Sequence, residues 1–125
     1  MLKVLYVDDD DDIREVAELS LQMDSMMEVR TASSGDAALS LLRGGAWRPH
    51  AVLLDVMMPG VDGPAVLRAM RTSEDFADLP VIFVTARVQK AETDGLLALG
   101  AVGIITKPFD PIAFAGRVRA LLASA

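Results

Sequence analysis

The sequence contains no cysteine among its 125 residues. This absence excludes a disulfide scaffold, a zinc–thiolate site, an iron–sulfur cluster and a cysteine nucleophile. Basic residues are also scarce, since 12 Lys and Arg stand against 18 Asp and Glu, for a formal net charge of −6. The phosphate backbone of a nucleic acid repels a protein with this net charge, so we expect no direct nucleic-acid binding.

Long apolar segments are missing as well, and no stretch approaches the length of a membrane span. The amino terminus has one lysine and then the acidic run Asp8–Asp12, which is not the pattern of a signal peptide. Hydrophobic residues make up 52% and charged residues 24%, which is typical of a folded globular domain. We therefore expect a cytoplasmic protein without membrane insertion, with one domain over residues 1–125 and no output domain.

Short apolar runs alternate with amphipathic segments along the whole chain. The runs are rich in Val, Ile and Leu and lack period-2 alternation, which is typical of strands buried on both faces of a parallel sheet. They are Val4–Val7, the surroundings of Val29, Ala51–Leu54, Val81–Val84 and Val102–Ile105. The segment around Val29 is more polar than the others, which indicates an edge strand.

Each apolar run is followed by a helical pattern with recognisable ends. The expected helices follow Asp10–Asp12, cover Gly35–Arg43 after Ser34, begin at Gly63-Pro64, cover Val88–Leu99, and cover Ile112–Ala123 after the N-cap Asp110 and Pro111. Five strand–helix repeats predict an α/β fold. We expect a doubly wound, five-stranded parallel sheet with helices on both faces and right-handed crossovers.

Polar residues follow four of the expected strands, at the carboxyl ends where open α/β sheets bind ligands. They are Asp8, Asp9, Asp55, Thr85 and Lys107. Three carboxylates in a small space favour a hard divalent cation such as Mg²⁺. A carboxylate can also attack phosphorus, and Lys107 and Thr85 are candidates to bind the phosphoryl oxygens. Each residue alone has an ordinary structural explanation, but their conjunction favours a functional site.

These residues lie in motifs that resemble the response-regulator receiver domains of two-component signalling, of the CheY type. The matching stretches are Val4–Asp10, Leu53–Gly63, Val81–Ala86 and Thr106–Phe109, of which Asp55–Gly63 is highly specific. The resemblance covers nearly the whole chain. It implies the flavodoxin-like (βα)5 fold with strand order 2-1-3-4-5.

The resemblance also implies a role for each site residue. Asp55 is the expected phosphoacceptor. The expected ligands of Mg²⁺, for which Mn²⁺ can substitute, are Asp9, Asp55, Asp8 through a water, and the backbone carbonyl of Met57. Lys107 is expected to pair with the acceptor or its phosphoryl group, and Thr85 to bind a phosphoryl oxygen and act as a switch. Pro59, Gly60 and Gly63 are expected to shape the adjacent loop, and the Lys107-Pro108 bond is expected to be cis.

The sequence departs from the family pattern beside the lysine. Ile104 occupies the switch position where an aromatic residue is common in the family, so the switch here has no aromatic ring or hydroxyl at this position. The preceding residues Val102 and Gly103 lack the acidic side chains of a common symmetric dimer, so we expect a monomer or weak dimer. Met57 and Arg87 stand at variable positions that flank the site and are expected to tune the lifetime of the phosphoryl group.

The function predicted from the sequence is a stand-alone response regulator, a signalling switch rather than an enzyme. It would accept a phosphoryl group from a histidine kinase or phosphotransfer protein and act on a downstream protein target. The expected output surface comprises Ile104 and exposed Gln89, Lys90, Glu92, Asp94, Arg117 and Arg119.

Four alternatives remain open. The chain could be a receiver from a longer regulator, a phosphorelay intermediate or phosphate sink, or a degenerate receiver. It could also be an aspartyl phosphohydrolase, although Met57 stands where such enzymes place a second aspartate.

Overall fold

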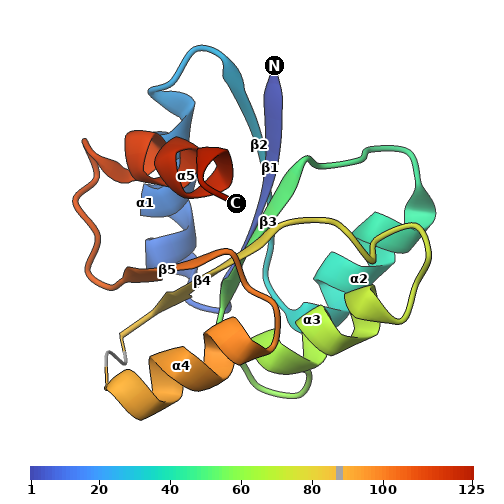
Figure 1. Cartoon of the computed structure of the whole chain (residues 1–125). Helices are drawn as coiled ribbons and strands as arrows, with labels where there is room; N and C mark the ends of the chain where they lie inside the picture. The colour runs from blue at the N-terminus through green and yellow to red at the C-terminus, as the bar shows by residue number, and fades with distance from the viewer. Residues whose placement is uncertain (87–88) are drawn as a thin grey trace.

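A computed structural model describes residues 1–86 and 89–125, in which strands and helices alternate (Figure 1). The strands are β1 (Leu2–Val7), β2 (Met27–Ala32), β3 (Ala51–Asp55), β4 (Val81–Thr85) and β5 (Gly103–Thr106). They form one parallel sheet in the order β2-β1-β3-β4-β5. The expected doubly wound sheet is therefore confirmed, and β2, which contains Val29, lies at an edge.

The helices cover both faces of this sheet. They are α1 (Asp11–Gln22), α2 (Gly35–Gly44), α3 (Gly63–Arg71), α4 (Lys90–Ala98) and α5 (Phe114–Ala123). Helices α1 and α5 lie on one side, and α2 and α3 lie on the other, with α4 near the β5 edge (Figure 1). In the part of the chain that the structure describes, every helix is too short or too polar to cross a membrane.

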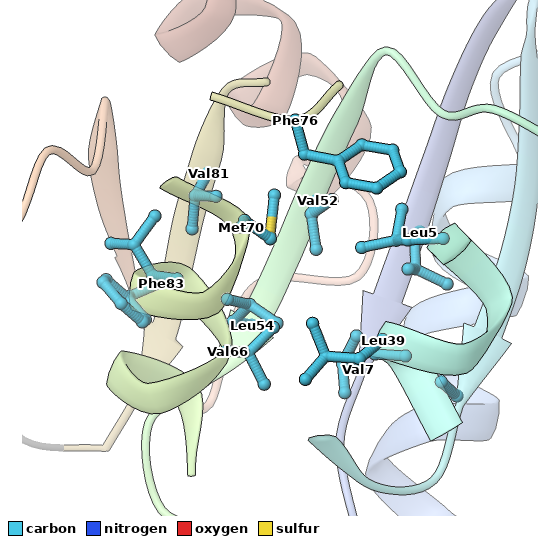
Figure 2. Close-up of a cluster of buried hydrophobic side chains, with 14 of the residues drawn as sticks. Leu5, Val7, Leu39, Val52, Leu54, Val66, Met70, Phe76, Val81 and Phe83 are labelled. Carbon is cyan, nitrogen blue, oxygen red and sulfur yellow. The ribbon is translucent and has the colours of Figure 1, made fainter. Parts of the chain in front are cut away.

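Alternate residues of each central strand point to opposite faces, which divides the core into two clusters. Leu5 and Val7 face α2 and α3 and belong to one cluster, in which Leu39 lies beside Val7 (Figure 2). Val4 and Tyr6, on the same strand, face α1 and α5. Strands β3 and β4 are buried along their whole length, which explains their continuous apolar sequences.

Side-chain caps set the starts of the first three helices. Asp10 Oδ1 accepts hydrogen bonds from the backbone N–H groups of Asp12 at 3.0 Å and Ile13 at 3.1 Å. Ser34 and Asp62 cap α2 and α3 in the same way. These caps satisfy N–H groups that have no partner within the helix, so the sequence indicated the helix starts well. The expected start of the fourth helix at Val88 lies outside the described residues.

The expected start of the fifth helix is wrong. Asp110 Oδ1 does accept the N–H of Ile112 at 2.9 Å, but the N–H of Ala113 bonds the Asp110 carbonyl at 3.1 Å. A hydrogen bond between residues i and i+3 closes a tight turn, whereas an α-helix needs bonds between residues i and i+4. The helix begins at Phe114, the first buried side chain of the segment, because packing rather than capping fixes its start.

The single tryptophan secures the connection that precedes β3. Trp47 is buried in the core cluster on the α2 side. Its indole Nε1 donates to a carboxylate oxygen of Glu28, and the Arg30 guanidinium lies 4.9 Å from the ring centroid. Both partners belong to β2, so Trp47 fastens this loop to the edge strand.

Candidate functional site

Three aspartates meet at the carboxyl ends of β1 and β3. Asp8 directly follows β1 and is fully buried, Asp55 is the last residue of β3 and is 8% exposed, and Asp9 faces solvent. One carboxylate oxygen from each residue lies within 4.8 Å of those from the other two. All-oxygen ligands at this spacing fit a hard divalent cation, and the adjacent strands β1 and β3 bring them together as the sequence predicted.

Asp8 is held by donors on both of its oxygens. Oδ1 accepts the backbone N–H of Asp10 at 3.0 Å. Oδ2 accepts the Tyr6 hydroxyl at 3.0 Å and the Lys107 ammonium at 2.8 Å. A fully buried carboxylate needs such partners to offset the loss of its hydration.

Lys107 links two of the three carboxylates. Its Nζ lies 2.8 Å from Asp8 Oδ2 and 3.3 Å from Asp55 Oδ1, and its side chain is only 13% exposed. The residue follows β5, and its backbone N–H bonds the Thr85 carbonyl at 2.9 Å. The Lys107-Pro108 bond is cis, as expected. Lys107 therefore pairs with the proposed acceptor, but Asp8 is the closer partner.

The acidic pocket disturbs the titration of Asp55. Burial and the neighbouring Asp8 raise its pKa, and Lys107 opposes this shift only in part, so the pKa of Asp55 reaches about 6. Burial is the larger cause, because it removes water from the charged carboxylate, and repulsion by Asp8 adds to it. A divalent cation would offset this repulsion and would compete with the proton for Asp55.

Thr85 and Ile104 lie on neighbouring strands. Thr85 ends β4, is 3% exposed, and pairs in register with Thr106 of β5. Ile104 is half-buried and packs against the core cluster on the α2 and α3 side. Thr85 is thus placed beside Lys107 at the sheet edge, as predicted, while Ile104 has an aliphatic core contact.

The loop between β3 and α3 needs glycine at two points. Gly60 has a φ of +74°, a left-handed conformation that favours glycine. A Cβ on Gly63 would lie 2.2 Å from the Asp55 carbonyl oxygen, which leaves no room for any side chain. Met57, in the same loop, is 60% exposed. Arg87, the second flanking position, lies outside the described residues.

Sequence reasoning missed two residues that hold Asp8. Arg14 of α1 donates from its guanidinium to the Asp8 carbonyl at 3.0 Å, and Tyr6 donates to the Asp8 carboxylate. A signal for Tyr6 existed, since it is the only tyrosine, stands in an aliphatic strand, and precedes Asp8 by two residues. Period-2 geometry places residues so related on the same face of a strand.

Two residues of the expected output surface are placed differently. Arg119 contacts Asp24 and the Met26 carbonyl, both in the connection between α1 and β2, and therefore faces away from α4. Glu92 is half-buried rather than exposed. Gln89, Lys90, Asp94 and Arg117 are exposed as predicted.

Comparison with known proteins agrees with this geometry. Residues 4–119 match the response regulator receiver domain family. The transcriptional regulatory protein CseB of Streptomyces coelicolor is 40% identical over 119 residues, which are 95% of this chain and 48% of that protein. The transcriptional regulatory protein AfsQ1 of the same organism is 39% identical over 122 residues, which are 98% of this chain and 52% of that protein. The chain thus spans about half the length of these curated relatives.

A solved structure extends the likeness to the fold. The chemotaxis protein CheY4 of Vibrio cholerae superposes with a TM-score of 0.86 at 30% identity, covering 97% of this chain and 98% of that one. The strand order, the acidic pocket and the match to the family model all lead to the same conclusion. The chain belongs to the response regulator receiver domain family of two-component signalling and is a signalling switch.

Proposed function

We propose that this receiver domain accepts a phosphoryl group on Asp55 from a phosphohistidine of a partner protein. The observation that carries the proposal is the position of Asp55, which is buried at the end of β3 with Lys107 Nζ 3.3 Å away. A carboxylate oxygen of Asp55 forms the bond to phosphorus while the phosphorus–nitrogen bond breaks. The imidazole leaves with the electron pair and takes up a proton.

The residues present fit Mg²⁺, with Asp9 and Asp55 as direct ligands, the Met57 carbonyl as another, and Asp8 as a ligand through water. The hydrogen bonds already made by both Asp8 oxygens support this indirect role. Bound Mg²⁺, or Mn²⁺ in its place, supplies charge that offsets the phosphoryl oxygens. Lys107 balances part of the remaining charge, and the Thr85 hydroxyl binds a phosphoryl oxygen.

A groove beside the pocket supports a protein as the phosphoryl donor. Its volume is about 560 Å³, and its lining comprises Asp12, Ile13, Val16, Ala86, Lys107, Pro108, Phe109 and Pro111. Most of these side chains are apolar, and Lys107 opens both to the groove and to the acidic pocket. This chemistry suits a helix of a histidine kinase or phosphotransfer protein that presents its histidine to Asp55.

Intact-mass measurement after incubation with acetyl phosphate and Mg²⁺ tests the acceptor. The wild-type chain should gain one phosphoryl group, and Asp55→Asn should gain none. Equal phosphorylation of the variant on an aspartate would contradict the assignment. Sustained hydrolysis of a phosphomonoester would instead favour a phosphohydrolase, which Met57 argues against because it cannot act as an acid or base.

We further propose that phosphorylation moves the loops at Thr85 and Lys107 and so alters the face formed by α4, β5 and α5. Amide hydrogen exchange with and without beryllofluoride should change in Thr85–Lys90, of which residues 87–88 lie outside the described residues, and in Val102–Lys107, but hardly at all in Met26–Thr31. A uniform change over the domain, or one confined to β2, would contradict this route.

The recipient of the signal is either a separate protein, as in a stand-alone regulator or a phosphorelay, or an attached output domain. The length of the curated relatives, about twice that of this chain, favours the second candidate. Capture with the phosphorylated chain, with Asp55→Asn as the control, distinguishes them. A partner that binds only the phosphorylated form supports action on a separate protein.

A further inference from the structure

Tyr6 lies directly beneath the acidic pocket and is fully buried. Its hydroxyl donates to Asp8 Oδ2 at 3.0 Å. A phenol keeps its proton at neutral pH, so the hydroxyl acts as a hydrogen-bond donor to this carboxylate. A buried hydroxyl that faces a carboxylate is a specific contact rather than part of the aliphatic packing of β1.

Aromatic packing fixes the direction of this hydroxyl. The Tyr6 ring meets Phe114 of α5 edge to face, with ring centroids 6.2 Å apart and planes at 85°. Phe114 in turn stacks on Phe109, at 4.0 Å and 13°. Phe109 stands two residues after Lys107 in the same loop. One set of rings therefore fixes the orientation of Tyr6 and supports the loop that carries Lys107.

Tyr6 and Lys107 share one acceptor atom, because both donate to Asp8 Oδ2. Hydrogen bonds to a carboxylate stabilise its charge and lower its affinity for any further cation. Without the hydroxyl, Asp8 would depend more strongly on Lys107 and on a nearby metal ion. The hydroxyl therefore weakens the attraction of Asp8 for the two cations that Asp55 also attracts, the Lys107 ammonium and a bound metal ion.

We infer that Tyr6 is a positioning residue of the acidic pocket, whose hydroxyl holds Asp8 and moderates the affinity of the pocket for Mg²⁺. This inference rests on the proposed function, because it concerns the same metal site. It predicts that removal of the hydroxyl makes Mg²⁺ binding tighter even though the metal-free protein becomes less stable. A residue that only fills space would change the stability and leave the affinity unaltered.

Calorimetric titration of Mg²⁺ into Tyr6→Phe tests the inference. The dissociation constant should fall about three- to tenfold, a fraction of the strength of one hydrogen bond to a charged group. The melting temperature without metal should fall by roughly 3–8 °C. The matched control is Val118→Ala, which creates a cavity in the same core cluster away from Asp8 and should leave the dissociation constant unchanged.

Repeating the change in an Asp8→Asn background completes the test. Tyr6→Phe should then leave Mg²⁺ affinity unaltered, because the hydroxyl acts through the Asp8 charge. An unchanged or weaker affinity of Tyr6→Phe with Asp8 intact overturns the inference, as does equal tightening in both backgrounds. Absence of Mg²⁺ binding by the wild-type chain would instead remove the proposed metal site itself.

Discussion

Replacement of Asp55 by asparagine should stabilise the metal-free protein, although it removes an ion pair. Asp55 stands with two other carboxylates whose oxygens lie within 4.8 Å, and its ion pair with Lys107 is the longer of two that this ammonium makes. Asp55→Asn leaves the 2.8 Å contact between Lys107 and Asp8 in place. The substitution therefore removes repulsion and keeps the stronger attraction.

The size of the effect follows from the titration of Asp55. Its pKa rises from 3.8 to about 6 on folding. Each unit corresponds to about 1.4 kcal/mol, so the charged form costs about 3 kcal/mol at most. The amide must still be buried and hydrogen-bonded, and we therefore expect Asp55→Asn to raise the unfolding free energy by about 1–2 kcal/mol.

The same shift in the pKa of Asp55 predicts how the stability difference depends on pH. Because the folded pKa of Asp55 is the higher one, the folded state binds more protons than the unfolded state between these two pKa values. The contribution of this carboxyl is fully present below about pH 4 and is lost as the pH rises through about 6. The variant should therefore be less stable than the wild type by about 1–2 kcal/mol near pH 4, where only the cost of the amide remains, and more stable than the wild type above pH 6.

Urea denaturation followed by circular dichroism, in EDTA over this pH range, measures the difference. Asp12→Asn is the matched control, since it removes the same charge from the exposed start of α1. A variant less stable than wild type at pH 7.5, or a stability difference that does not change with pH, would refute the reasoning. Added Mg²⁺ should reverse the order, because at one hundred times its dissociation constant a ligand stabilises the folded wild type by about 2.7 kcal/mol.

Two further predictions concern the ligands and the loop. Asp9→Asn should weaken Mg²⁺ binding at least about tenfold by calorimetry, while Asp12→Asn should change it less than about twofold, because only Asp9 lies in the acidic cluster. Gly63→Ala should lower the unfolding free energy by about 2 kcal/mol or more in urea, because its Cβ would meet the Asp55 carbonyl oxygen at 2.2 Å. Gly44→Ala, whose Cβ meets nothing within 4 Å, should not destabilise the protein; a comparable loss in both would contradict the steric argument.

Most of the fold was predictable because it depends on local patterns. The apolar runs before Asp55 and Thr85 are typical of strands buried on both faces, and parallel strands bring their carboxyl ends to one edge of the sheet. The start of the fifth helix was predicted too early because the Asp110 side chain bonds the N–H of Ile112, whereas the helix begins at Phe114. The burial of Phe114, which marks the true start, is known only from the fold.

The site residues were predictable as a set, but not their pairing. Strand ends identify Asp8, Asp55 and Lys107, yet which carboxylate the ammonium approaches depends on differences below 1 Å. The contact of Arg119 with Asp24 joins residues 95 positions apart and has no local sequence signal. Such contacts depend on the final packing of α5 against α1 rather than on periodicity.

The attachment of Trp47 to β2 makes its fluorescence a selective probe. Its partner Glu28 is in register with Lys3, which precedes Asp8 by five residues, or about 16 Å along a strand. Emission from the indole should therefore respond to unfolding but not to direct contact with a ligand in the acidic pocket. A change of the tryptophan spectrum on phosphorylation would report a movement transmitted through β1 and β2. An unchanged spectrum would indicate that the response is confined to the part of the sheet near β4 and β5.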